Sequence, residues 1–209
     1  MAVRVEDLID LRDVRQVRGK QSPNLISQDS FRQIEILAKE LGFREVHLSQ
    51  ASDIVTARWV RLKCRYGCAK YNTSWCCPPA APNLQMTRDI LSEYELAILL
   101  VSENTNEHFY RNSPSKRRIQ IKQWKSTIAL ERKLFLMGYY KAFGLPADTC
   151  ALCKECAYPK QCKFPNEKRP TMEACGIDVF QTLKNLDLST GLVRKVQDCF
   201  YSYSLILLA

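Results

Sequence analysis

Eight of the ten cysteines in this 209-residue chain fall into two groups, and the second group has a spacing that suits metal binding. It contains four cysteines within thirteen residues: Cys150, Cys153, Cys156 and Cys162. Two successive two-residue spacings place three thiolates around one point, as iron–sulfur clusters require. Zinc sites more often combine two separated Cys-x2-Cys pairs. The spacing therefore predicts an iron–sulfur cluster, with zinc as the alternative metal.

The last spacing of the second group departs from the bacterial ferredoxin pattern, C-x2-C-x2-C-x3-C-P. Five residues separate Cys156 from Cys162, and the next proline is Pro165. Since the first three cysteines match half of that pattern, a four-iron, four-sulfur (4Fe–4S) cluster is expected at this group. The longer spacing leaves open whether Cys162 closes the same cluster or binds elsewhere.

The first group consists of Cys64, Cys68, Cys76 and Cys77. Gly67 is expected to permit a tight turn that brings Cys64 and Cys68 together. Cys77 precedes Pro78, which pushes its backbone toward the extended region, and neighbouring extended residues point to opposite faces. Cys76 and Cys77 are therefore not expected to bind the same cluster. Cys77 is the predicted ligand, and Cys76 is left as a spare thiol, a substrate-facing nucleophile or a buried side chain.

The first group thus supplies three predicted ligands: Cys64, Cys68 and Cys77. Three ligands would leave one iron of a 4Fe–4S cluster free for water, substrate or sulfide. An open metal position of this kind can act as a Lewis acid. The sequence thus predicts two clusters, one held by cysteine for electron transfer and one open to an anionic or sulfur-containing small molecule. The remaining cysteines and histidines are predicted to be structural: Cys175, Cys199, His47 and His108.

The chain is basic, with 31 Lys and Arg against 22 Asp and Glu and a formal net charge of +9. Such an excess favours an acidic partner. An acidic electron donor such as a ferredoxin or flavodoxin is the partner that suits the iron–sulfur interpretation. Basic residues gather near both cysteine groups: Arg61, Lys63, Arg65, Lys70, Lys154, Lys160, Lys163, Lys168 and Arg169.

Aromatic residues interleave with these basic ones, and this combination favours a second function. Base stacking on aromatic rings together with phosphate contacts is typical of nucleic-acid binding. The alternative to the redox protein is therefore a zinc-stabilised nucleic-acid-binding module. The aromatic residues concerned are Tyr66, Tyr71, Trp75, Tyr158 and Phe164.

The N-terminal residues are charged and lack an apolar signal segment. No stretch of about 18 apolar residues occurs anywhere in the sequence. We therefore expect a cytoplasmic protein without a membrane span, in which the cysteines stay reduced rather than forming disulfides.

Two parts of the chain differ in their periodicity. Residues 1–28 are expected to form a charged N-terminal arm, and 29–209 a single metal-binding domain with cysteine sites at 64–77 and 150–162. Interleaved helices and strands predict an α/β or α+β fold, with a single mixed sheet flanked by helices and cysteine-rich metal-binding loops.

Local signals predict the individual elements. A capping box at Ser30 and a stop at Gly42 predict the first helix. A strand over 54–63 is expected to deliver the chain to Cys64. The other predicted elements are strands at 45–48, 95–101 and 200–209, and helices capped by Asn83, from 113 to about 142 and from about 172 to 183.

Two stretches of the sequence resemble a known family. One is Lys63-Cys64-x-x-Gly67-Cys68 with Cys77-Pro78-Pro79-x-x-Pro82; the other is Cys150-x-Leu-Cys153-x-x-Cys156 with Cys162 and the segment from Arg169 to Asp178. Together they resemble domain of unknown function 2284, a family of predicted metal-binding proteins, from about Glu45 to Ala209. The resemblance implies a prokaryotic, cytoplasmic protein that binds metal through Cys64, Cys68, Cys77, Cys150, Cys153, Cys156 and Cys162. We further expect Arg169–Ala174 to begin a helix beside the second site, with its polar N-terminus toward the anionic cluster.

Overall fold

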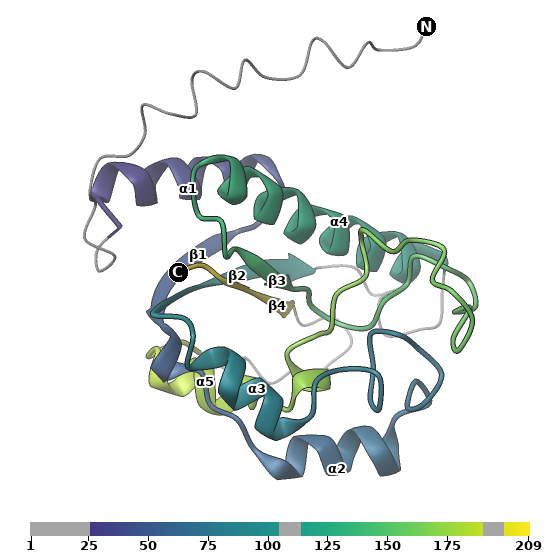
Figure 1. Ribbon diagram of the computed structural model, residues 1–209. Coiled ribbons are helices and arrows are strands. Elements are labelled where there is room, and N and C mark those ends of the chain that lie inside the picture. The colour runs from purple at the N-terminus through teal and green to yellow at the C-terminus, as the bar shows by residue number, and fades with distance from the viewer. Residues whose placement is uncertain (1–25, 105–113, 190–198) are drawn as a thin grey trace, which may run out of the picture.

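The computed structural model describes residues 26–104, 114–189 and 199–209, which form one four-stranded sheet with helices on both faces (Figure 1). The predicted N-terminal arm lies almost wholly outside the described residues. The elements in chain order are α1 (Gln28–Glu40), β1 (Glu45–Gln50), η3 (Ala51–Asp53), α2 (Arg58–Gly67), α3 (Leu84–Leu91), β2 (Leu96–Asn104), α4 (Pro114–Leu136), β3 (Phe143–Leu145), η5 (Glu173–Cys175), α5 (Val179–Asn185) and β4 (Phe200–Leu207).

The sheet has the strand order β1-β2-β4-β3, and every strand pair in it is antiparallel. The register places Glu45 opposite Val101, and Ala97 opposite Leu207. β2 lies in the interior, and every one of its residues except Glu103 is buried. The predicted class, a mixture of helices and strands with a single sheet flanked by helices, is confirmed. The sheet itself is antiparallel throughout rather than mixed.

Two hydrophobic cores lie on opposite faces of this sheet. Successive residues of a strand point to opposite faces, so Ile98 and Leu100 enter one core while Ala97 and Leu99 enter the other. The first core joins the sheet to α1 and α4 through Ile34, Ala38, Leu130 and Leu134. The second joins it to α3, η5 and α5 through Leu91, Met172, Ile177 and Leu183. Figure 1 shows α1 and α4 above the sheet and α3 and α5 below it.

Several predicted element ends are confirmed by the structure. Asn83 caps α3, because its side chain accepts a hydrogen bond from the backbone N–H of Met86 at 2.9 Å. Gly42 follows α1 with a φ of +91°, a conformation that glycine adopts without strain. α4 begins at Pro114 as predicted, and the strands at 45–50, 96–104 and 200–207 lie where they were expected.

Two helix ends were predicted wrongly. The first helix is capped by Ser27 rather than Ser30, since the Ser27 Oγ accepts a hydrogen bond from the Ser30 N–H at 3.1 Å. α4 stops at Leu136 rather than near 142, because Gly138 takes a φ of +101°. The chain then enters the short strand β3, which contains Gly144. Ser113 lies outside the described residues.

The predicted strand over 54–63 is wrong, because most of this segment belongs to α2. Apolar and basic residues alternate from Val60 to Tyr66, a pattern that is also typical of a strand. In the structure Val60 is buried, and the helix packs against η5 instead of joining a sheet edge. A helix satisfies its backbone N–H and C=O groups internally. The segment therefore needs no neighbouring strand, and Cys64 lies on a helix rather than at a strand end.

The predicted helix over 172–183 is also wrong, since the structure divides it into η5 and α5. Gly176 separates them with a φ of +83°. Ile177 then forms an antiparallel bridge with Thr56, which pulls the chain into an extended conformation. Asp178 restarts the helix, accepting a hydrogen bond from the Gln181 N–H at 3.0 Å.

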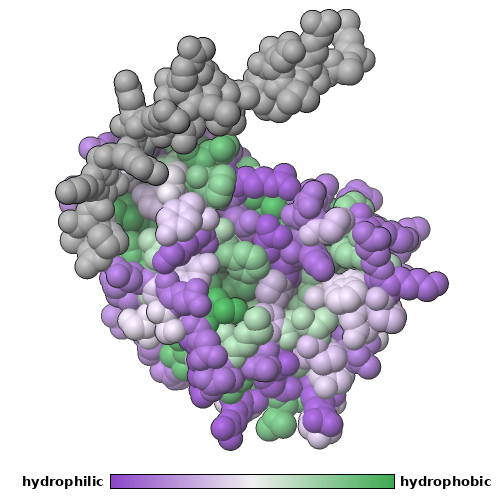
Figure 2. Space-filling view, viewed as in Figure 1, coloured by the Kyte–Doolittle hydropathy of each residue, from purple (hydrophilic) through white to green (hydrophobic). Residues whose placement is uncertain are grey.

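The surface in Figure 2 is a mixture of hydrophilic and hydrophobic residues, with hydrophilic ones predominating along the outline of the described part. Within the ranges that the structure describes, none of the helices combines the length and apolarity that a membrane crossing requires.

Candidate metal centre

The helix α2 brings the first two cysteines together. Cys64 lies in its last turns, and Cys68 is the C-cap residue four positions later. Residues four apart lie on one side of a helix, so the x3 spacing alone pairs these side chains. Gly67 is the last helical residue and does not have a positive φ. The prediction that a tight turn at Gly67 pairs them is therefore wrong.

Cys77 lies near this pair, although a loop of eight residues separates it from Cys68. Burial, followed by the charge of the nearby Cys68 thiolate, raises the pKa of Cys77 to about 11, and Cys64 contributes in the same direction. Cys77 is buried, Cys64 is half-buried and Cys68 is exposed. The three cysteines predicted to be ligands therefore lie within electrostatic range of one another, and the Cys68 side is open to solvent.

The second group surrounds a small cavity between the loop after α2 and the loop after β3. Figure 1 shows these loops on the same side of the molecule. Cys150, Cys153, Cys156 and Cys162 line the cavity, and Cys76 from the first group lines it as well. Its other lining residues are Lys70, Ser74, Trp75, Leu152 and Phe164. Five thiols from two distant parts of the sequence therefore share one space.

Cys76 forms part of the buried wall of this cavity. Only 3% of it is exposed, and it packs with Trp124 and Ile128 of α4 and with Leu152. A side-chain interaction between Cys76 and Cys150 raises the pKa of Cys76 and lowers the pKa of Cys150. Cys76 thus lies with the cysteines of the second group, whereas its neighbour Cys77 lies near Cys64 and Cys68.

Trp75 holds the two cysteine loops together. Its indole N–H donates to the carbonyl of Lys160 at 2.8 Å. Its ring meets Tyr158 edge-on, with centroids 5.0 Å apart, and the Lys168 Nζ lies 4.9 Å from the ring centroid. These contacts link the residue next to Cys76 with the loop that carries Cys156 and Cys162.

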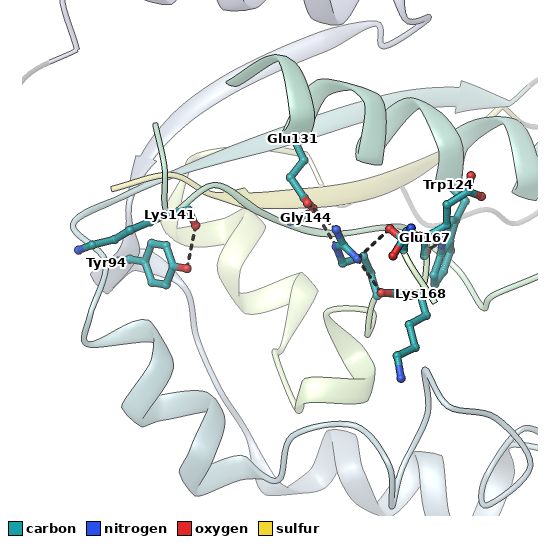
Figure 3. Close-up of polar contacts among 9 residues, drawn as sticks. Tyr94, Trp124, Glu131, Lys141, Gly144, Glu167 and Lys168 are labelled. Carbon is teal, nitrogen blue, oxygen red and sulfur yellow. Dashed lines mark hydrogen bonds and ion pairs between the residues drawn. The ribbon is translucent and has the colours of Figure 1, made fainter. Parts of the chain in front are cut away.

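The helix α4 supports the second cysteine loop at several points. The indole N–H of Trp124 donates to the carbonyl of Glu167 at 2.8 Å, and Figure 3 shows these two residues in contact. Arg117 donates to the carbonyl of Leu152 at 3.0 Å, next to Cys153. The long helix therefore fixes both the start and the end of the loop from 150 to 168.

Glu131 of α4 anchors the chain that follows this loop. Its carboxylate accepts hydrogen bonds from Arg169 at 2.9 and 2.5 Å. It also accepts a hydrogen bond from the backbone N–H of Gly144 at 2.7 Å, and Figure 3 shows Glu131 projecting from α4 toward Gly144. The side chains of Arg169 and Glu131 are only 15% and 10% exposed. This buried ion pair joins α4, β3 and the cysteine loop.

The segment from Arg169 to Ala174 takes a different place from the predicted one. Its only regular part, η5, packs against α2 beside the first group. Arg61 of α2 donates a hydrogen bond to the carbonyl of Ala174, and the Cys64 Sγ lies 3.8 Å from the carbonyl oxygen of Glu173. The prediction of a helix beginning here beside the second group is wrong, although the backbone of Arg169 does reach Cys76.

The remaining candidates lie apart from both groups. Cys175 is buried in the core below the sheet, and Cys199 is exposed just before β4. His47 lies in β1, where it pairs with Glu45 at 3.1 Å. His108 lies outside the described residues.

The cysteines of each group share a space without converging on one point. In the part of the chain that the structure describes, no three histidine, cysteine, aspartate or glutamate side chains come close enough to hold a single metal ion. Backbone N–H groups nevertheless point at two of the sulfurs. Lys70 donates to the Cys68 Sγ and Phe164 to the Cys162 Sγ, both at 3.4 Å.

Three residues shape these sites in ways that the sequence did not predict. Strand alternation indicated that Cys76 turns away from Cys77. It could not reveal that the loop from 150 to 168 lies on the side to which Cys76 turns. Trp75 was noted only as a possible stacking residue for nucleic acid. Glu131 carried no sequence signal, because its partner Arg169 lies 38 positions away.

Comparison with known proteins gives one match. The model of a family described as predicted metal-binding protein (DUF2284) matches residues 47–208, which include every cysteine discussed above. No curated protein and no solved structure matches the chain.

Proposed function

Since this chain belongs to the DUF2284 family of predicted metal-binding proteins, we propose that it is an iron–sulfur redox protein with two 4Fe–4S clusters. The observation that carries the proposal is the cavity lined by five thiols. The other three cysteines of the first group lie beside it: Cys64, Cys68 and Cys77. One cluster serves electron transfer, and the other has an open iron for small-molecule chemistry.

The arrangement of the thiols suits a group larger than one ion. A tetrahedral zinc ion with Zn–S bonds of about 2.3 Å needs its thiolates roughly 3.8 Å apart. The cysteines share a cavity, and no three of them in the described residues are placed to hold a single ion. A polynuclear cluster spreads its ligands over several irons. Lys70 in the cavity lining and the N–H groups directed at sulfur also favour an anionic occupant.

At the second site, Cys150, Cys153 and Cys156 supply three thiolates, and Cys162 is the fourth in the ligand set expected from the sequence. When bound there, the cluster supplies one-electron redox chemistry. The protein's part is to exclude water on one side, through Leu152, Trp124 and Ile128. An apolar wall of this kind influences the reduction potential.

At the first site, Cys64, Cys68 and Cys77 are proposed to hold a cluster with one iron that has no cysteine ligand. The exposure of Cys68 supports this proposal, because a small molecule can reach that side from solvent. An anion or a sulfur-containing compound is the class of ligand that an iron of this kind takes. The buried Cys77 fixes the inner side of the site.

An acidic electron donor is the proposed partner. The lysines and arginines nearest the two sites are exposed: Lys63, Arg65, Lys70, Lys154, Lys160, Lys163 and Lys168. Electrostatic steering by such a surface speeds encounter with an acidic protein, and salt weakens it. Reduction of the clusters by a ferredoxin or flavodoxin should therefore slow markedly between low and physiological ionic strength. A rate that does not respond to salt would exclude this docking surface.

The test of the metal assignment is analysis of protein purified without oxygen. We expect iron and acid-labile sulfide in equal amounts, with a brown colour that reductant bleaches. Zinc in stoichiometric amount without sulfide would overturn the proposal. Tight binding of single-stranded DNA or RNA by that zinc protein would then establish the alternative, a nucleic-acid-binding module, for which Tyr66 is available as an exposed stacking residue.

A further inference from the structure

Two buried cysteines of the chain have the same exposure and very different surroundings. Cys76 and Cys175 are each 3% exposed. Cys175 packs in the core among aliphatic side chains such as Leu91, Ile177 and Leu183. This is the usual role of a free buried cysteine, which behaves as a small apolar residue. Cys76 instead faces a cavity in which four other thiols meet.

The neighbours of Cys76 distinguish it further. Its side chain lines the same cavity as Cys150, the first cysteine of the Cys-x2-Cys-x2-Cys run. On its other sides it packs with Trp124, Ile128 and Leu152. Ser74 accepts a hydrogen bond from the Cys76 backbone N–H at 3.2 Å and so fixes the backbone that carries it. The sulfur is thus held at the inner wall of the second site.

We infer that Cys76 is the fourth ligand of the second cluster, together with Cys150, Cys153 and Cys156. This inference rests on the proposed function and refines its ligand set. A run of three cysteines with two-residue spacings commonly takes its fourth ligand from elsewhere in the chain, as in two-cluster ferredoxins. Cys162 also lines the cavity, but a five-residue spacing separates it from the run of three, so it is the thiol that the inferred ligand set leaves out.

The Cys76 assignment connects the two sites. Cys77 lies with Cys64 and Cys68, and its Cα is about 3.8 Å from that of Cys76 across one peptide bond. The charge of Cys150 also reaches Cys77. Consecutive residues would therefore hold different clusters, and a single peptide bond would join the two sites.

Alanine substitutions test the ligand assignment. Cys76→Ala should lose about half of the iron and sulfide, the content of one cluster. If the cluster persists on three thiolates, its electron paramagnetic resonance (EPR) spectrum and reduction potential should change instead. Cys175→Ala, matched in burial, and Cys162→Ala should keep the iron content and the spectrum of the wild type. Wild-type iron content together with a wild-type spectrum in Cys76→Ala would overturn the inference.

EPR of the fully reduced protein tests the connection between the sites. Two clusters joined by one peptide bond should show a spectrum broadened by spin–spin interaction. Cys77→Ser, which should lose the first cluster, is expected to show the simple spectrum of an isolated one. A wild-type spectrum equal to the sum of two isolated clusters would refute the connection. Absence of iron and sulfide from the wild type would refute the proposed function itself, so the two failures are distinguishable.

Discussion

At the scale of single residues, the surroundings of a side chain decide its role more than its type does. The chain contains ten cysteines. Cys175 is a core residue, Cys199 is exposed outside both groups, and Cys76 forms the wall of a thiol-lined cavity. The same holds for glycine. Gly176 has a φ of +83°, whereas Gly67 has no positive φ and has free space around it.

The two glycines therefore predict opposite effects of substitution by alanine. Gly176→Ala should lower the free energy of unfolding by about 2 kcal/mol or more, because an L-residue is strained at positive φ. A Cβ there would also lie 2.8 Å from the Leu84 Cδ1. Gly67→Ala should be neutral or stabilising by up to about 1 kcal/mol, since alanine is the better helix former.

Urea denaturation of both variants, with and without metal, measures these changes. A second consequence is that Gly176→Ala should weaken metal retention at the first site, because η5 packs against α2 beside Cys64. Equal stability of the two variants would contradict the strained role of Gly176.

At the scale of elements, the cysteine loops depend on contacts with better-ordered segments. The residues from 146 to 172 contain no helix or strand, so their position depends on side-chain contacts. Trp75 fixes this segment to the first loop, and Trp124, Arg117 and Glu131 fix it to α4. Arranged in this way, the loops bring the thiols to one cavity.

Removal of the Trp75 ring should loosen the second loop. Trp75→Ala loses the hydrogen bond to Lys160 and the edge-on contact with Tyr158, which together contribute about 1–3 kcal/mol. We expect faster proteolysis between residues 150 and 168 and a lower melting temperature. Trp75→Phe keeps an aromatic ring and should show a smaller effect on both measurements. Unchanged proteolysis in Trp75→Ala would show that the contacts to α4 suffice.

Breaking the buried ion pair should be more costly. Glu131→Ala leaves the guanidinium of Arg169 without its carboxylate and the N–H of Gly144 without its acceptor. The loss of one partner of a buried pair costs about 3–5 kcal/mol. The exposed pair Arg44–Glu103 provides the comparison, and Glu103→Ala should cost no more than about 1 kcal/mol. Denaturant unfolding of both variants should show this difference, and similar costs would contradict it.

At the scale of the whole molecule, the folded core and the metal sites are largely separate. The sheet and its two hydrophobic cores contain no cysteine of either group in the described residues. The cysteine groups lie at one side of the molecule (Figure 1), where α4 connects the second group and η5 the first group to the core. Exposed basic residues surround them, which is the charge that the proposed acidic partner requires.

Removal of metal should therefore destabilise the molecule without unfolding it. Metal binding to a site absent from the unfolded chain adds to the free energy of folding. For a chain of this size, each kcal/mol lost lowers the melting temperature by about 2–4 °C. We expect the metal-free protein to melt several degrees lower while its far-ultraviolet circular dichroism persists. A random-coil spectrum after chelation would show instead that the core depends on the metal.

The sequence by itself determined the local features. Asn83 caps α3 with its own side chain, and Gly42 and Pro114 act through their own backbone. The strand β2 follows from a continuous apolar run, and β4 from the apolar residues at its end. The spacing of Cys150, Cys153 and Cys156 predicted a compact group for the same reason. Each of these signals operates over a few residues, so it survives in any tertiary setting.

Only the tertiary structure decided the features that depend on distant partners. The alternating segment from Val60 to Tyr66 is a helix because it packs on η5 and has no strand beside it. Gly176 divides the predicted helix where Ile177 meets Thr56. Cys76 joins the Cys150 loop, more than seventy residues away, through Trp75 and α4. Contacts of this kind leave no periodic trace in the sequence, because their energy arises only when the fold brings both partners together.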